Sequence, residues 1–322
     1  MLYPLKFTPI LKEKIWGGHR FHSKTNQNLG DKKIGESWEI SGVKDEISIV
    51  ENGSLKGEVL EDLIIEFKDQ LLGKSVYERF NAQFPILIKF IEARDNLSVQ
   101  LHPDDQLAKK RHNSFGKTEM WYIIESENNA KLILDFKDNL SAKKLKDLIN
   151  SGKIENSLNS ISVKEGDAFF IKPGLVHAIG AGVLLAEIQQ TSDITYRIYD
   201  WNRVDEEGNT RELHTDLALE AIDFDNTSDY RIRYDSVLNT KVPLADTPYF
   251  KTKFLEINKD LNLDYSKVDS FIIFMNVGHS SATISHKNIH YSILSKETIL
   301  IPACIDTLEI KSAGTKLLEI SI

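Results

Sequence analysis

The feature of this sequence that most constrains its fold is a succession of short strand-like runs of apolar residues, many alternating with polar ones. Such runs occupy 85–93, 97–102, 119–124, 167–172 and 184–190, and several more follow residue 247. Successive side chains of a β-strand point to opposite faces, so these runs are typical of strands with a buried face. Turn residues separate them. The pattern therefore favours a mainly β protein built from barrels or sandwiches.

Helical spacing of apolar residues appears as insertions between the strand-like runs. It covers 59–73, 141–152 and 214–224. Ser141 is a favoured N-cap residue, and Gly73 and Gly152 are typical of helix C-termini. We therefore expect helices that interrupt a β framework without changing its class.

The periodicity also suggests how the chain divides into domains. Residues 223–246 show no clean periodicity, and we interpret them as a linker. Short strand-like runs resume after it and are typical of a second, smaller β domain. We therefore predict a catalytic barrel with helical insertions over 1–235 and a C-terminal β domain over 236–322.

The composition excludes several classes of protein. Hydrophobic residues make up 41% and charged residues 27% of the 322 residues, which is a normal globular balance. The formal net charge of −8 gives no indication of nucleic-acid binding, which favours a basic patch. A few local Lys and Arg residues can still bind an anionic substrate. The single cysteine, Cys304, can form neither an internal disulfide nor a zinc site made of cysteines.

The same sequence features predict a cytoplasmic location. Charged residues interrupt 1–18 every few positions, so this segment lacks the apolar core of a signal peptide. No run approaches the roughly 18 apolar residues that a membrane span needs. We expect a monomer or homodimer whose partners include neither a membrane nor a nucleic acid.

Polar residues on one face of a strand give the first indication of chemistry. In NLSVQLHPDD, residues 96–105, the side chains of Ser98, Gln100 and His102 share one face, and the apolar side chains between them share the other. A buried strand with polar atoms on one face needs partners for them. The alternative is an exposed edge strand with an incidental histidine.

Two later segments add a carboxylate and a second imidazole. In GKTEMWYII, Lys117, Glu119 and Trp121 share a strand face. In EGDAFFIKPGLVHAIG, His177 follows a Pro-Gly turn and is flanked by apolar residues, which favours an interior position. Taken alone, the glutamate also fits a solvent-facing strand and the histidine an exposed turn.

Together these segments supply the donor set of a metal site. Gln100, His102, Glu119 and His177 offer two imidazoles, one carboxylate and one amide oxygen. Imidazole and carboxylate are ordinary zinc ligands, and a catalytic zinc keeps one position open for water or substrate. Two histidines and one carboxylate can also hold non-haem iron, so an oxygenase is a competing interpretation. A non-catalytic sugar-binding protein is another.

Several runs resemble a known family in that family's order. They are IWGG (15–18), GESWEIS (35–41), LSVQLHPDD (97–105), GKTEMWY (116–122), GLVHAIGAG (174–182) and EIQQTSDITYRIYDW (187–201). The chain resembles the type I mannose-6-phosphate isomerases in their short bacterial form, which belong to the cupin superfamily. The resemblance implies a mainly β fold, with a cupin (jelly-roll) barrel, helical insertions and a smaller C-terminal cupin-like domain.

The resemblance also implies an activity and a cofactor. The activity is that of an aldose-ketose isomerase, an intramolecular oxidoreductase that interconverts mannose 6-phosphate and fructose 6-phosphate through an enediol. The cofactor is one Zn²⁺ per chain, and the ligands of the family fall on Gln100, His102, Glu119 and His177.

Further family positions imply catalytic residues. The active-site arginine of the family falls on Arg197, two acidic residues of the same run fall on Glu187 and Asp193, and a lysine falls on Lys117. The base that moves the carbon-bound proton stays open between the two acids and a water on the zinc. Ten residues of strand span roughly 33 Å, so the run from Glu187 to Arg197 must bend.

Substrate-binding positions follow less directly. A phosphate at C6 needs cationic or backbone donors at some distance from the metal, and Lys117 and Arg203 are candidates. Trp16 and Trp38 lie in two of the matching runs. They are candidates for the lining of the sugar pocket, and the alternative for both is an ordinary place in the core.

Overall fold

The computed structural model describes residues 1–204, 207–225 and 230–322, which group into two compact units. The first unit comprises Met1–Ile10, Ser37–Phe90 and Ile232–Ile322, and the second comprises Leu11–Glu36 and Ile91–Arg231. This grouping differs from a single division after residue 235, because N-terminal segments belong with the C-terminal strands. The assignment of 1–235 as the catalytic domain stays a prediction.

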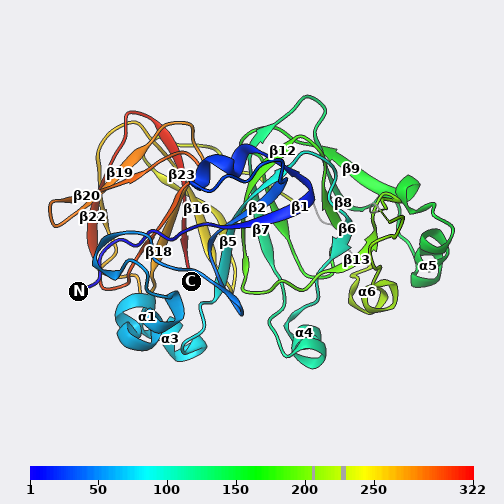
Figure 1. The fold of residues 1–322 in the computed structure, drawn as a ribbon, viewed down its shortest axis with the longest axis horizontal. Coiled ribbons are helices and arrows are strands. Elements are labelled where there is room, and N and C mark those ends of the chain that lie inside the picture. The colour runs from blue at the N-terminus through cyan, green and yellow to red at the C-terminus, as the bar shows by residue number, and fades with distance from the viewer. Residues whose placement is uncertain (205–206, 226–229) are drawn as a thin grey trace. The chain divides into compact units, whose positions relative to one another are not determined.

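The second unit is built mainly from β-strands (Figure 1). Its elements are η1 (Arg20–Lys24), β6 (Val99–Leu101), α4 (Asp105–His112), β7 (Glu119–Ser126), β8 (Lys131–Phe136), α5 (Ala142–Asn150), η3 (Ile154–Ser157), β9 (Leu158–Ser162), β10 (Ala168–Ile171), β11 (His177–Ile179), β12 (Val183–Gln190), β13 (Tyr196–Tyr199) and α6 (Thr215–Ala221). Four strands have residues in both units: β1 (Ile10–Gly18), β2 (Ile34–Ile40), β5 (Ile86–Ala93) and β14 (Arg231–Ile232). The strands form a seven-stranded sheet, β1-β2-β5-β12-β7-β10-β14, and a five-stranded sheet, β13-β6-β11-β8-β9.

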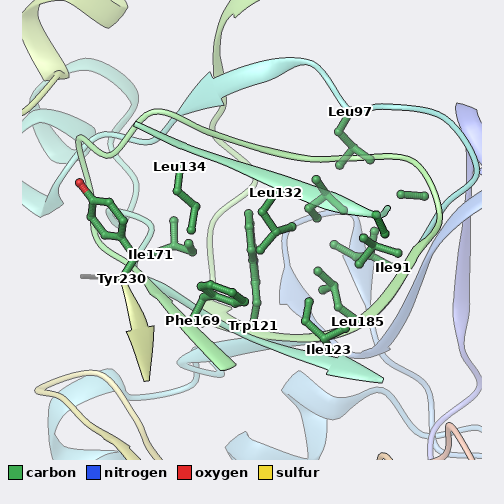
Figure 2. Close-up of a cluster of buried hydrophobic side chains, with 14 of the residues drawn as sticks. Ile91, Leu97, Trp121, Ile123, Leu132, Leu134, Phe169, Ile171, Leu185 and Tyr230 are labelled. Carbon is green, nitrogen blue, oxygen red and sulfur yellow. The ribbon is translucent and has the colours of Figure 1, made fainter. Parts of the chain in front are cut away.

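A buried apolar cluster lies between these two sheets. Trp121 of β7 and Phe169 of β10 come from one sheet, and Leu132 and Leu134 of β8 come from the other. Figure 2 shows the two aromatic rings among aliphatic side chains. Burial of apolar surface from both layers is the main force that holds such a sandwich together.

The outer face of the five-stranded sheet packs against helices. Val99, Leu101 and Ala178 on this face join Leu145 of α5 and Ala218 of α6 in a second buried cluster. Because side chains alternate along a strand, the residues between them point to the inner face. The sheet is therefore buried on both sides, and its inner face is available for polar side chains that find partners there.

The first unit has its own β sandwich and a group of helices. Its elements are β3 (Gly42–Val43), β4 (Glu46–Ile47), η2 (Gly53–Leu55), α1 (Leu60–Phe67), α2 (Asp69–Leu72), α3 (Lys74–Phe80), β15 (Lys241–Asp246), β16 (Lys251–Ile257), β17 (Leu261–Asp264), β18 (Ile272–Asn276), β19 (Ala282–His286), β20 (Ile289–Ile293), β21 (Thr298–Ile301), β22 (Thr307–Lys311) and β23 (Thr315–Ser321). Two sheets, β15-β16-β23-β18-β21 and β17-β22-β19-β20, enclose an apolar core.

The mainly β fold that the sequence predicts is confirmed. The strands form packed open sheets, and the sheet orders of the described residues contain no closed ring. No helix of the described chain has both the length and the apolar character of a membrane span. Helices over 141–152 and 214–224 are confirmed as α5 and α6, and the hydroxyl of Ser141 accepts the N-cap hydrogen bond from Lys144 at 3.2 Å.

Two expectations need correction. The single helix over 59–73 is interrupted, because Lys68 adopts φ 49° and divides it into α1 and α2. The linker over 223–246 is wrong for residues 231–232, which form β14 beside β10, and for residues 241–246, which form β15 and pair with β16. Residues 226–229 of that segment lie outside the described residues. Periodicity failed here because β15 alternates only weakly.

A charged cluster is buried in the first unit. Glu319 is 3% exposed and accepts a hydrogen bond from the hydroxyl of Tyr265. The ammonium of Lys241 lies 2.5 Å from the same carboxylate and donates to the Tyr265 oxygen at 2.9 Å. The buried carboxylate is therefore compensated by these two neighbours and by the Lys253 ammonium 3.4 Å away.

We predict that Tyr265→Phe lowers the free energy of unfolding by about 1–3 kcal/mol, since it leaves a buried carboxylate with one donor fewer. Urea denaturation at neutral pH measures the change. Tyr291→Phe is a matched control, because that ring is only half-buried and stacks on Tyr3. The control should change stability by less than about 0.5 kcal/mol. Equal losses in both variants would contradict the prediction.

Candidate metal centre

Three short segments of the second unit bring imidazole and carboxylate groups together. His102 directly follows β6, Glu119 is the first residue of β7, and His177 is the first residue of β11. Each is only 1% exposed. Their ligand atoms lie within 4.8 Å of one another, and among the described residues they form the group whose spacing suits a metal ion.

A tight turn links the segments that carry the two histidines. Gly174 precedes His177 and adopts φ 80°, a conformation that L side chains rarely adopt. A Cβ at this position would lie 2.7 Å from the carbonyl oxygen of Ala221. The Gly174 N–H donates to the carbonyl oxygen of His102 at 2.9 Å, so the turn holds the two histidine segments side by side.

Backbone hydrogen bonds orient both imidazoles. The Nδ1–H of His102 donates to the carbonyl of Ile194 at 2.8 Å, and the Nδ1–H of His177 donates to the carbonyl of Leu175 at 2.9 Å. Each Nε2 therefore presents a lone pair to the interior. Both Nε2 atoms and Oε2 of Glu119 are buried without a hydrogen-bond partner among the described residues.

The electrostatics fit a divalent cation. Burial, assisted by the Lys117 ammonium, lowers the pKa of His102 to about 3, and burial also lowers the pKa of His177. Burial raises the pKa of Glu119, but Lys117 and His102 outweigh it and hold that pKa well below 4.5. Nε2 of neutral His102 therefore faces an anionic oxygen of Glu119 at 3.2 Å. Two neutral imidazoles and one carboxylate are an ordinary zinc donor set.

Lys117, a predicted catalytic and substrate-binding residue, lies in this group. Its side chain is buried, and its Nζ is 3.2 Å from Oε1 of Glu119. The ammonium holds the carboxylate in its ionised form, which is the form that binds a metal. A direct role for Lys117 in catalysis stays a prediction.

Gln100 and Arg197 lie in one row with His177 across the five-stranded sheet. Gln100 is opposite His177 in the β6–β11 ladder and opposite Arg197 in the β6–β13 ladder. Residues directly opposite in antiparallel strands point to the same face. The structure therefore brings all three to the site, whereas the role of Gln100 as a fourth ligand stays a prediction.

Arg197 is fixed by neighbouring acceptors. Its Nε donates to the hydroxyl of Ser98 at 3.2 Å, and its Nη1 donates to the carbonyl of Glu212 at 2.9 Å. Burial, and then the nearby Arg211, lower the pKa of the guanidinium, which nevertheless stays charged at neutral pH. A fixed, partly buried cation thus lies beside the ligand row.

The two acidic candidates differ in environment. Glu187 is 3% exposed and accepts a hydrogen bond from Nε1 of Trp121 at 2.7 Å. The indole ring of Trp121 makes a T-shaped contact with the imidazole of His177, with ring centroids 5.3 Å apart. Asp193 is exposed and lies between β12 and β13. These strands belong to different sheets, so the run bends there, as the length argument requires.

Arg203 belongs to a cluster that the sequence reasoning missed. Its Nη2 and the guanidinium of Arg211 both bind Oδ1 of Asp200, which is 6% exposed. Burial raises the pKa of Asp200, but the two arginines outweigh it and lower that pKa overall. The three-residue spacing of Asp200 and Arg203 could have indicated their ion pair. No sequence pattern indicates the contact of Arg211 with Asp200, because Arg211 lies in a different loop.

The two tryptophans expected near the sugar are buried in apolar clusters. Trp16 is 4% exposed in the cluster that contains Trp121. Trp38 is 6% exposed in a small cluster of the first unit, where the Lys89 ammonium lies 5.2 Å from the centre of its ring. Both positions match the core alternative, and a role in lining the sugar pocket stays a prediction.

We predict that the metal-free protein loses stability as the pH falls below 6.5. The folded-state pKa of His102, about 3, lies below its ordinary 6.5, so the unfolded chain takes up a proton that the folded chain cannot. The stabilisation is complete above pH 6.5 and is lost towards pH 3. His102→Gln should flatten this slope in urea denaturation after chelator treatment, and the exposed His290→Gln should not. Parallel slopes in all three proteins would contradict the prediction.

Known proteins match this chain in sequence. The family described as phosphomannose isomerase type I, catalytic domain, matches residues 4–119. The mannose-6-phosphate isomerase of Streptococcus mutans is 31% identical over 307 residues, which cover 95% of this chain and 94% of that protein. These matches confirm the resemblance that the sequence motifs indicated.

Solved structures match the fold over its whole length. The mannose 6-phosphate isomerase of Bacillus subtilis has a TM-score of 0.87 and 31% identity over 100% of both chains. A mannose 6-phosphate isomerase bound with zinc and yttrium shares the fold at a TM-score of 0.77 and 15% identity, over 99% of both chains. The sequence and structural matches agree, and the chain belongs to the type I phosphomannose isomerase family of enzymes.

Proposed function

We propose that this enzyme interconverts mannose 6-phosphate and fructose 6-phosphate with the help of one zinc ion. The observation that carries the proposal is the buried group of His102, Glu119 and His177, whose lone pairs converge without partners in the described chain. The relatives named above support the choice of reaction. We also propose that the enzyme acts in the cytoplasm, as a monomer or homodimer.

The residues fit a zinc ion by their donor types and their orientation. His102 and His177 would hold the ion through their Nε2 atoms, and Glu119 would hold it through its carboxylate. Gln100, opposite His177 in the sheet, would supply a neutral fourth oxygen. When bound, zinc would supply Lewis-acid polarisation of the sugar oxygens at C1 and C2.

Arg197 and Lys117 would stabilise negative charge that develops on the sugar oxygens. Isomerisation moves a proton between C1 and C2 through an enediol, so charge grows on O1 and O2 during the reaction. Arg197 is held in place by Ser98 and lies in the row with Gln100 and His177. Lys117, two residues before β7, adds a second buried cation beside Glu119.

Glu187 is the better placed of the two acidic candidates for the base. It is buried in the second unit and anchored by Trp121, which packs against His177. Asp193 is exposed, so solvent would compete with substrate for its carboxylate. We therefore propose that Glu187 takes and returns the carbon-bound proton.

Arg203 and Arg211 would supply positive charge for the C6 phosphate. Asp200 binds both guanidiniums, the Arg203 guanidinium also lies 3.6 Å from Asp95, and Arg197 adds a further cation nearby. Planar guanidinium groups suit the bidentate recognition of phosphate. The carboxylate of Asp200 would thus hold the arginines in place before the substrate arrives.

A coupled assay with mannose 6-phosphate tests the reaction. We predict turnover that a chelator abolishes and added zinc restores, and loss of both metal and activity in His177→Ala, because that variant removes a ligand. His279→Ala, in the first unit, is the matched control and should retain both. Full activity in a zinc-depleted His177→Ala protein would exclude the proposal, and metal-dependent oxygen uptake would favour an oxygenase.

Arg197→Ala should keep the metal and lose turnover. We expect kcat to fall by about 100-fold or more, because a fixed cation is removed from the place where charge develops. Arg94→Ala is the control, since Arg94 pairs with Glu127 on an exposed surface of the same unit. Metal content and steady-state kinetics are the measurements. An unchanged kcat with normal metal content would remove Arg197 from the mechanism.

A further inference from the structure

Gln190, the last residue of β12, connects two segments beside the metal ligands. One segment follows His102, and the other precedes Glu119. Gln190 is 4% exposed. Its Oε1 accepts a hydrogen bond from the N–H of Thr118 at 2.9 Å, and its Nε2 donates to Oδ1 of Asp105 at 2.9 Å. Both ends of a buried carboxamide are therefore occupied, and each end contacts a different segment.

The two contacted segments are the two ends of one insertion. Residues 103–118 separate His102 from Glu119 and contain α4, which Figure 1 shows standing away from the sheets. Asp105 lies at the first end and Gly116 at the second. Oδ1 of Asp105 also accepts a hydrogen bond from the N–H of Gly116 at 2.8 Å. A single carboxylate oxygen and a single carboxamide thus close the base of the insertion.

The closure leaves no spare room. A Cβ at position 116 would lie 2.5 Å from the backbone nitrogen of Asp105 and 2.6 Å from the carbonyl carbon of Asp104. The N–H of Lys117 also donates to the carbonyl of Pro103 at 3.2 Å. The two ends therefore meet backbone to backbone, immediately beside the two ligands that they carry.

We propose that Gln190 is a positioning residue of the metal centre, whose carboxamide holds the two ends of the 103–118 insertion together so that His102 and Glu119 meet at one ion. Partners that orient ligands typically change metal affinity by about 10- to 100-fold when they are lost. The inference rests on the zinc site of the proposed function, but it does not depend on which sugar the enzyme converts.

The decisive variant reverses the polarity of the carboxamide. Gln190→Glu places a carboxylate oxygen against Oδ1 of Asp105, so residue 190 and the first end of the insertion repel each other where they now bind. We expect zinc affinity to fall by about tenfold or more, measured by competition with a chromophoric chelator on the full-length protein. This readout needs no substrate.

A second substitution should rescue the first. In Gln190→Glu/Asp105→Asn, the new amide donates to the new carboxylate, while its carbonyl oxygen still accepts the N–H of Gly116. We expect zinc affinity to return to within about threefold of the original value, since the two sites act as a coupled pair. A residue with a purely structural role elsewhere would show no such reciprocal recovery.

Control variants separate positioning from general destabilisation. Asn159→Asp changes another carboxamide of the second unit, one that donates to the carbonyl of Leu134 at 3.0 Å, and it should leave zinc affinity unchanged. If Gln190→Glu fails to fold, Gly116→Ala tests the same closure, because its Cβ would force the ends apart. Unchanged zinc affinity in a folded Gln190→Glu or Gly116→Ala protein would overturn the inference. Absence of zinc binding by the unsubstituted protein would instead overturn the proposed function.

Discussion

The contact between Nε2 of His102 and the carboxylate of Glu119 determines how this site is arranged. Both side chains are 1% exposed, and the atoms are 3.2 Å apart. Each presents lone pairs, because Nδ1 of the imidazole carries the proton and donates it to the carbonyl of Ile194. Two buried acceptors at this distance repel each other unless a cation lies between them. The surrounding groups follow from that requirement.

The fold satisfies this requirement with strands from two sheets. The seven-stranded sheet contributes Glu119, and the five-stranded sheet and its extension contribute His102 and His177. The helices α5 and α6 cover the outer face of the second sheet, so its inner face can carry polar groups without exposing the apolar ones. The two sheets pack on the apolar cluster that contains Trp121, and this packing holds the ligand side chains close to one another.

Alternation along the strands was enough to predict which faces the site residues occupy. Val99 and Leu101 lie under the helices, and Gln100 lies in a row with His177, as the period of two requires. The convergence of His102, Glu119 and His177 could not be predicted from spacing alone, because the intervening loops differ in length. It depended on the resemblance to a family.

Contacts that form only when distant segments close were not predictable from a single sequence. Arg211 reaches Asp200 from another loop, and Gln190 bridges both ends of an insertion, so neither interaction leaves a local pattern. Local backbone conformation limited the secondary-structure predictions as well. Lys68 in the left-handed region divided a helix that apolar spacing alone would continue.

Anomalous X-ray diffraction at the zinc absorption edge, from crystals grown with zinc, would locate the ion. We expect one strong peak in the second unit, about 2.0–2.2 Å from Nε2 of His102, Nε2 of His177 and Oε2 of Glu119. A protein that shows no peak there, or one whose peak lies only at surface histidines such as His19 and His22, would contradict this expectation.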